Sequence, residues 1–258
     1  MIVHIHIPKC GGTTFNLVLH RRFRERFLSV YDDNRPGWFL TPEEARRLLE
    51  SRPDAQAIAG HCLRHPLPPI EGRVYRYATF LRDPVERAVS VYFNERKVAA
   101  AQGGTHCCHL PFEAYVEVRP SIDNAISDWQ TFHLDPEGDL EKAKDALRQF
   151  DMVGVVEAYD ETIVSQCARL GIPLRAMTYV KMNASKQPAR EPLIVSSAAR
   201  RRLESLNARD IELHRFAREL LDKAIHERGR SFHFALACFD AANRLRQAAH
   251  RVRYSRPR

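Results

Sequence analysis

The chain has 258 residues, of which 44% are hydrophobic and 9% aromatic, as in soluble globular proteins with a substantial core. Its 40 Lys and Arg residues exceed its 32 Asp and Glu residues, and the net charge of +8 favours an anionic ligand such as a nucleotide, an acidic sugar or a nucleic acid. The sequence lacks the run of about 18 apolar residues that a membrane span needs. Pro8 and Lys9 interrupt the N-terminal apolar segment before a signal peptide can form, so we expect a cytoplasmic protein.

The six cysteines lack the spacing of a disulfide framework, so we expect reduced thiols. We predict a single domain over residues 1–240 and a basic, flexible tail over 241–258. A frayed, solvated end accounts for this tail better than an arm that binds nucleic acid or a membrane. The tail is basic because of Arg244, Arg246, Arg251, Arg253, Arg256 and Arg258.

The first predicted strand covers residues 2–7, which alternate and are rich in Ile and Val, and a tight turn follows at Gly11 and Gly12. A helix is expected from Thr13 to about Phe27. Another begins after Thr41, where a Thr cap, a Pro and a Glu take the positions typical of a helix start.

Strands and helices continue to alternate along the chain, with an irregular insertion on the substrate side at 99–121. Strands are predicted at 57–59, 75–81 and 152–156, and helices from 84, over about 159–170 and over 197–228. This alternation defines the α/β class, with a mostly parallel central sheet flanked by helices. Active sites of such sheets lie beyond the carboxyl ends of the strands, where the turns at 8–14 and 82–87 fall.

The first of these turns has the composition of an anion-binding loop. Glycines let the backbone approach an anion, and the helix that follows offers free N–H groups and the positive end of its dipole. The segment is not a Walker A loop, because its lysine precedes the glycines. A plain strand-to-helix turn is the alternative, but it leaves the coincidence of residue types unexplained. The predicted ligand residues are Lys9, Cys10, Gly11, Gly12, Thr13 and Thr14.

The second turn leaves a strand with an arginine and continues into a helix. Arg82 is suited to a bidentate grip on a terminal phosphate, and the Ser90 hydroxyl can complete the contact. Asp83 is a natural helix cap and is predicted to be structural. Arg87 fits an exposed helix residue as well as it fits a ligand contact.

Together the two motifs resemble sulfotransferases that use 3′-phosphoadenosine 5′-phosphosulfate (PAPS), most closely the carbohydrate (heparan sulfate/uronyl) 2-O-sulfotransferases and their bacterial relatives. The family's 5′-phosphosulfate loop is similar to residues 6–14, HIPKCGGTT, and its 3′-phosphate site to 81–92, LRDPVERAVSVY. The resemblance spans about residues 2–220. Weaker similarity lies at 59–61, 123–124, 130–131, 153–157 and 183–186.

The resemblance implies a P-loop-like sulfotransferase fold and transfer of a sulfuryl group from PAPS to a hydroxyl, in a carbohydrate by family analogy, without a metal. It implies that Lys9 contacts the bridging oxygen, that residues 11–14 hold the 5′-phosphosulfate, and that Arg82 with Ser90 holds the 3′-phosphate. Lys186 is carried over as a further ligand contact. Cys10 stands where relatives often have Thr, and the segment 130–133 departs from the family pattern, which leaves the acceptor open.

His61 is the predicted general base. It follows a short apolar strand and Gly60, which would leave space for a substrate, and the related enzymes carry a catalytic histidine in a matching Gly-His element. His65 is the leading substitute and Glu157 the next. His4 and His6 are expected to pack within the sheet. Trp38 and Trp129 are expected to lie in the core or to line a groove.

Two other functions are alternatives. A nucleotide kinase-like P-loop enzyme would need a lysine after the glycines and a magnesium carboxylate in the expected places. A non-catalytic, basic nucleic-acid-binding protein would fit the charge, but no recognition motif supports it. The segment 105–109, THCCH, has the wrong spacing for zinc and is predicted as a loop.

Overall fold

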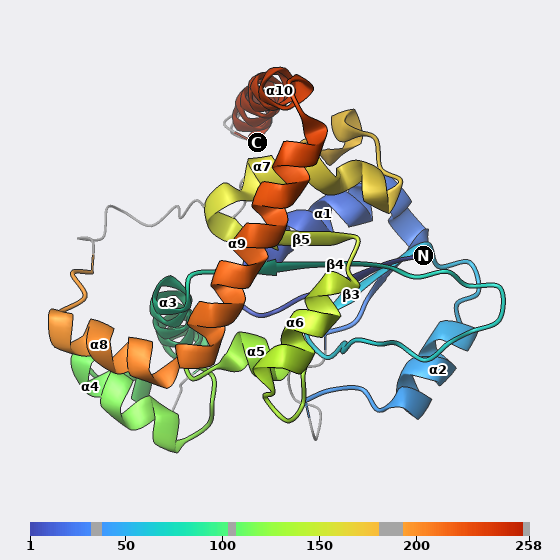
Figure 1. Ribbon diagram of the computed structural model, residues 1–258. Helices are drawn as coiled ribbons and strands as arrows, with labels where there is room; N and C mark the ends of the chain where they lie inside the picture. Colours follow the sequence, from blue (N-terminus) through green and yellow to red (C-terminus); the bar gives the residue numbers. More distant parts are fainter. Residues whose placement is uncertain (32–37, 103–106, 181–192, 255–258) are drawn as a thin grey trace.

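The computed structural model describes residues 1–31, 38–102, 107–180 and 193–254 (Figure 1). In this part of the chain the sheet has five parallel strands in the order β2-β3-β1-β4-β5. The strands are β1 (Ile2–Ile5), β2 (Phe27–Ser29), β3 (Ala57–Gly60), β4 (Arg76–Leu81) and β5 (Met152–Val155). The predicted fold class is confirmed.

The central strand β1 pairs with β3 on one side and with β4 on the other. Ile2 lies opposite Ala57 in β3 and opposite Arg76 in β4, so the carboxyl ends of all three strands meet at one edge. From β1 the chain first builds β2 and β3 on one side and then crosses to β4 and β5. The edge beyond β1 and β4 is therefore the switch point, where α/β sheets bind their ligands.

The edge strand β2 was not expected from the sequence, which predicted that the first helix continues to about Phe27. Helix α1 (Gly12–Phe23) ends earlier, because Arg24 takes a φ of 50° and a short 3-10 turn follows. Strand β2 has only three residues and a half-exposed face, so it leaves too little alternation to detect.

Two helix starts were predicted and are confirmed. In α2 (Pro42–Glu50) the Thr41 hydroxyl accepts a hydrogen bond from the Glu44 amide at 3.2 Å, and the Glu44 carboxylate accepts one from the Thr41 amide at 2.8 Å. Helix α3 (Pro84–Gln102) is capped by Asp83, which accepts a bond from the amide of Glu86 at 2.9 Å.

Helices α3, α4 and α8 pack on one another beside the sheet around a second apolar core, whereas α9 packs on β5 (Figure 1). The region 99–121 is more regular than expected, since it holds the end of α3 and all of α4. The remaining helices are α4 (Phe112–Val118), α5 (Trp129–Leu134), α6 (Leu140–Arg148), α7 (Tyr159–Gln166), α8 (Ser197–Leu206), α9 (Ala208–Arg228) and α10 (Ser231–Tyr254). None of the described helices is both long and apolar enough to cross a membrane.

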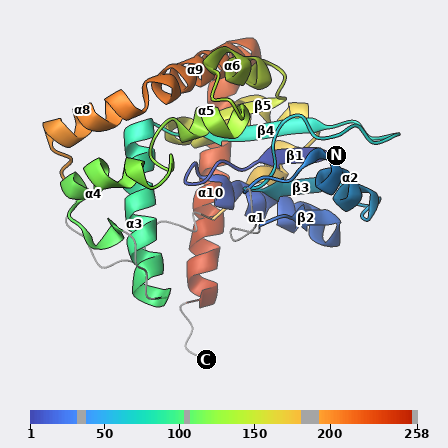
Figure 2. The same cartoon turned by 90° about the horizontal axis from the view of Figure 1, so that it is seen from below.

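The basic C-terminal segment is helical as far as Tyr254. Residues 241–254 form the second half of α10, which extends beyond the sheet in Figure 2. Asn243 ties this helix to the body by accepting a hydrogen bond from the Tyr179 amide at 3.0 Å. Alanine is the best helix former, and its frequency in this segment favours the helix. Helix α10 runs without a break across residues 240 and 241.

Candidate active site

The loop between β1 and α1 has the geometry of an anion site. Gly11 has a φ of 73° and Lys9 one of 68°, so the chain turns sharply through the left-handed region. Helix α1 begins without a side-chain cap and without an acidic residue in its first turn. An anion at this helix N-terminus would meet unshielded amides and the positive end of the dipole.

Cations gather at this loop. The Lys9 ammonium donates to Asn94 Oδ1 at 3.1 Å, and Arg82 Nη1 reaches the carbonyl of Lys9 at 3.4 Å. Burial lowers the pKa of Lys9, and the positive charges of Arg82, Lys97 and Arg87 lower it further. A bound anion would relieve this repulsion, so the site is electrostatically prepared for a negative ligand.

Arg87 is a buried residue that supports the site. The sequence left open whether it is exposed on the helix or contacts a ligand. Its side chain is 2% exposed. Its Nε donates to the carbonyl of Pro8 at 3.2 Å and its Nη1 to that of Ala125 at 2.8 Å. Arg87 thus fastens the anion loop to α3 and to the segment before α5.

A single amide joins the two predicted motifs. The Gln130 side-chain oxygen accepts from the Arg82 amide at 2.9 Å and from the Cys10 thiol at 3.3 Å, while its nitrogen donates to the Arg82 carbonyl at 2.9 Å. Burial raises the pKa of Cys10 to about 12, so the thiol is neutral. Cys10 as a whole is buried, and its thiol is directed at the Gln130 side chain.

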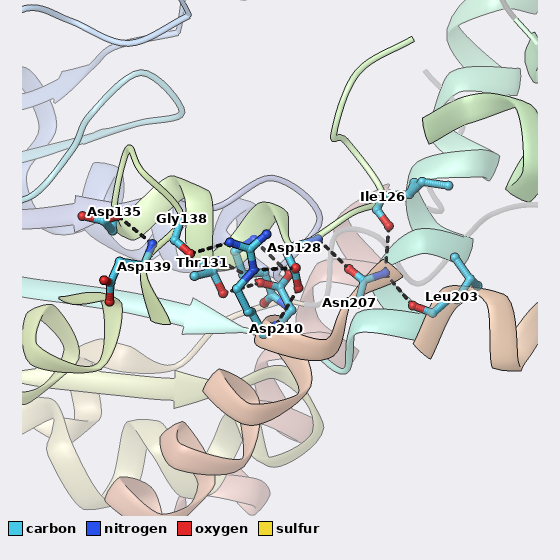
Figure 3. A network of polar contacts seen from close by, with 11 residues as sticks. Ile126, Asp128, Thr131, Asp135, Gly138, Asp139, Leu203, Asn207 and Asp210 are labelled. Atoms are coloured by element: carbon cyan, nitrogen blue, oxygen red, sulfur yellow. Dashed lines mark hydrogen bonds and ion pairs between the residues drawn. The ribbon is translucent and has the colours of Figure 1, made fainter. Parts of the chain in front are cut away.

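Gln130 is itself held by a buried network that reaches α9. Figure 3 shows the part of this network around Asp128, Thr131 and Asp210. The Asp210 carboxylate, 0% exposed, accepts bonds from the amide of Gln130 at 3.0 Å, the amide of Thr131 at 2.7 Å and the hydroxyl of Thr131 at 2.8 Å. Asp128 accepts a bond from the Asp210 amide at 3.0 Å, and Asn207 accepts one from the Asp128 amide at 3.1 Å. The network fixes the start of α5 and, through it, both motifs.

The remaining residues that are predicted to bind the sulfuryl donor lie around the same edge of the sheet. Thr13 is exposed and Thr14 half-buried in the first turn of α1, and Ser90 is half-buried on α3. The Arg82 guanidinium lies 3.7 Å from the Glu86 carboxylate. Lys186 falls outside the described residues.

His61 follows β3 at the same edge of the sheet, next to buried imidazoles. Its ring centroid lies 4.5 Å from that of His6 and 4.7 Å from that of Tyr31. His6 Nδ1 lies 2.6 Å from the Tyr31 hydroxyl and accepts from Asn16 at 3.2 Å, while His4 donates to Asn16 Oδ1 at 2.5 Å. His4 and His6 are buried within the sheet as predicted. Burial lowers the pKa of His4 to about 4 and that of His6 well below its usual range, so both are neutral.

Gly60 has a different role from the predicted one. A Cβ at this position would lie 1.9 Å from the carbonyl oxygen of Val30. The glycine therefore admits the backbone of the neighbouring segment, and it does not open space for a substrate.

The two alternative bases lie in other surroundings. The His65 ring packs on Tyr77, with centroids 4.6 Å apart, at the amino-terminal end of β4 and thus at the opposite edge of the sheet. Glu157 accepts from the Asp83 amide at 2.9 Å and bonds His214 at 3.1 Å. Although burial alone would raise it, the pKa of Glu157 is lowered by these two bonds. Glu157 braces the second motif.

Metal ligands are not grouped in the described part of the chain, where no three His, Cys, Asp or Glu side chains could hold an ion. His106 and the side chain of Cys108, from the segment 105–109, lie outside it.

A parallel sheet whose switch point carries an uncapped helix and clustered cations is typical of enzymes that bind an anionic ligand. The chain matches the sulfotransferase family over residues 1–217 and belongs to that family. It is therefore a transferase of sulfuryl groups with the sulfotransferase fold. No curated protein matches the chain. Helix α10 lies beyond the matched residues.

Proposed function

We propose that the protein transfers a sulfuryl group from PAPS to a hydroxyl of a carbohydrate. The observation that carries the proposal is the junction of the two motifs, where Arg82 meets the carbonyl of Lys9 and Gln130 bonds both segments. Two cationic segments held at a fixed separation suit a donor with an anionic group at each end.

In this proposal the acceptor oxygen attacks sulfur while the bond from sulfur to the bridging oxygen breaks. Lys9 neutralises the charge that grows on that oxygen, and the amides of residues 11–14 hold the phosphosulfate. Arg82 and Ser90 grip the remote 3′-phosphate. His61 takes the proton of the acceptor hydroxyl, and adenosine 3′,5′-bisphosphate leaves.

Calorimetry with two nucleotides tests the donor site. Adenosine 3′,5′-bisphosphate should bind at least about tenfold more tightly than 5′-AMP, since a charge-assisted bond to phosphate contributes roughly 1.5–3 kcal/mol. Arg82→Ala should remove most of this difference. Equal affinities of the wild-type protein for the two nucleotides would contradict the assignment of the second motif.

The base is tested by His61→Ala, with His65→Ala as the matched control at the opposite edge of the sheet. His61→Ala should lower kcat by about 10²–10⁴ and abolish the acidic limb of the pH–rate profile, with little change in nucleotide affinity. The control should keep its turnover. A His61 variant with wild-type turnover would place the base elsewhere.

A further inference from the structure

Helix α10 lies beyond the residues that match the family, and one face of it holds the helix on the protein. Phe232 and Phe239 are buried, and the ring of Phe239 lies 6.3 Å from that of Tyr179. Asn243, one turn further along, accepts the hydrogen bond from the Tyr179 amide. Because Phe232, Phe239 and Asn243 recur at intervals of seven and four residues, they share one face of the helix.

The opposite face of α10 is exposed and apolar. Phe234 is 76% exposed and Leu245 is 73% exposed. Eleven residues make about three turns of an α-helix, so these two side chains lie on one line along it. Between residues 234 and 249 every exposed position except Arg244 is apolar. We call these positions the α10 stripe: Phe234, Ala237, Cys238, Ala241, Leu245, Ala248 and Ala249.

The shape of the α10 stripe indicates what kind of partner can cover it. Contiguous apolar patches on protein surfaces mark sites that bind other proteins or membranes. The α10 stripe runs for about 22 Å, since each residue of a helix advances about 1.5 Å. It lies on the convex surface of a helix whose second half extends beyond the sheet (Figure 2). A convex surface in this position can lie along a flat partner.

Arginines border the α10 stripe on both sides. Successive residues of a helix are about 100° apart, so Arg244 and Arg246 flank Leu245 on opposite sides. Burial lowers the pKa of Arg21 in α1, and the positive charge of Arg246 lowers it further, so cations of the two helices repel one another here. Residues 241–258 contain six arginines and no Asp or Glu. A partner should therefore carry negative charge on both sides of an apolar zone.

A lipid surface with anionic headgroups has this arrangement, because the headgroups lie beside an apolar interior. A second copy of α10 does not, because the helix has four arginines and one acidic residue, Asp240, so two copies would repel one another. We propose that α10 binds the protein to an anionic lipid surface and lies along that surface. Phe234 and Leu245 insert below the headgroups, while Arg244 and Arg246 bind the lipid phosphates. This interaction goes beyond sulfuryl transfer and does not depend on the donor or the acceptor.

Co-sedimentation of the full-length protein with lipid vesicles tests the proposal without turnover. The vesicles contain phosphatidylcholine alone or phosphatidylcholine with phosphatidylglycerol. The protein should bind the anionic vesicles at least about tenfold more tightly than the neutral ones. Raising the salt from about 50 to about 300 mM should weaken this binding severalfold, because salt screens exposed charges.

The apolar part of the contact is tested by the double variant Phe234→Ser/Leu245→Ser. It should bind the anionic vesicles at least about tenfold more weakly, because it loses the two large side chains of the α10 stripe. Both residues are exposed, so the Tm should stay that of the wild type. Val74→Ser/Ile194→Ser is the matched control, because these residues are 75% and 86% exposed and lie outside α10. The control should bind as the wild type does.

The charged part of the contact is tested by Arg244→Gln/Arg246→Gln. This variant should bind at least about tenfold more weakly, because one arginine near an anionic surface contributes about fivefold in affinity. Arg47→Gln/Arg201→Gln, at exposed positions of α2 and α8, removes the same charge and should keep the wild-type affinity.

The proposal is overturned if the wild-type protein does not bind anionic vesicles, if either double variant in α10 binds as the wild type does, or if the two arginine pairs lose affinity equally. It is also overturned by a dimer in sedimentation equilibrium that Phe234→Ser/Leu245→Ser dissociates, since a second copy would then cover the α10 stripe. Polyglutamate that binds more tightly than the vesicles would assign the helix to an acidic protein instead. Nucleotide calorimetry tests the proposed function separately, because none of these variants lies in the two motifs.

Discussion

Replacing Gly12 by alanine would test how the buried rings of His4 and His6 support the loop between β1 and α1. The new Cβ would lie 2.1 Å from Cδ2 and 2.4 Å from Nε2 of His6, and 2.8 Å from Cε1 of His4, whereas ordinary contacts begin near 3.4 Å. Both rings are buried and bonded to Asn16, so they have little freedom to move. The strain should therefore lift the loop away from the imidazoles.

The expected cost follows from two opposing contributions. Overpacking a buried site costs about 1–3 kcal/mol, and alanine in a helix returns up to about 1 kcal/mol relative to glycine. Gly12→Ala should thus destabilise the protein by roughly 1–2 kcal/mol, or about 2–8 °C in Tm. Since the displaced loop is also the proposed phosphosulfate site, the affinity for adenosine 3′,5′-bisphosphate should fall by about tenfold or more.

Urea unfolding and calorimetry of a double-mutant cycle provide the measurement. His6→Ala removes the ring that the new methyl group would strike, so it should cost less in the Gly12→Ala background than in the wild type. Gly72→Ala is the control, because its Cβ would meet nothing within 4 Å and only its φ of 71° is strained. Strict additivity of Gly12→Ala and His6→Ala, or wild-type nucleotide affinity in Gly12→Ala, would refute the reasoning.

Three further outcomes are expected. Lys9→Ala should lower kcat far more than it weakens nucleotide binding, because charge grows in the transition state at the bridging oxygen that Lys9 is proposed to contact. Arg82→Ala should chiefly raise the KM for PAPS, because the charge of the 3′-phosphate does not grow in the transition state. Steady-state kinetics showing the reverse would mean that the two sites are exchanged. The free energy of unfolding should fall by up to roughly 3 kcal/mol as the pH drops from 6.5 toward about 4, because His4 binds a proton in the unfolded chain and stays neutral when buried. Urea unfolding at pH 7 and pH 4.5 measures this change, and equal stabilities would contradict a neutral His4. Turnover should survive EDTA, and activity that is lost and then restored by zinc or magnesium would be the contrary result.

Local signals in the sequence predicted the elements that depend on neighbouring residues. The capping box at Thr41 and the cap at Asp83 each lie within three residues of their partners, so the sequence alone could identify them. The lysine and the glycines of the first motif also lie within four residues of one another, so the sequence alone predicts an anion-binding loop at this position.

Features that depend on distant residues were not predictable in this way. Asp210 supports the amide of Gln130 across 80 positions of the chain, and no local pattern marks either residue as structural. The burial of Arg87 depends on carbonyls of two other segments. The close approach of Val30 to Gly60 requires β2, which the sequence did not reveal.

The contacts of the Gln130 side chain restrict which substitutions this enzyme can tolerate. Because one amide oxygen accepts from both the Cys10 thiol and the Arg82 backbone, a change on either side alters the bond on the other. Substitutions at these positions should show epistasis, with a given replacement of Cys10 acceptable only in combination with particular residues at 130. Sequence changes in the segments around Cys10 and Arg82 are thus expected to occur together.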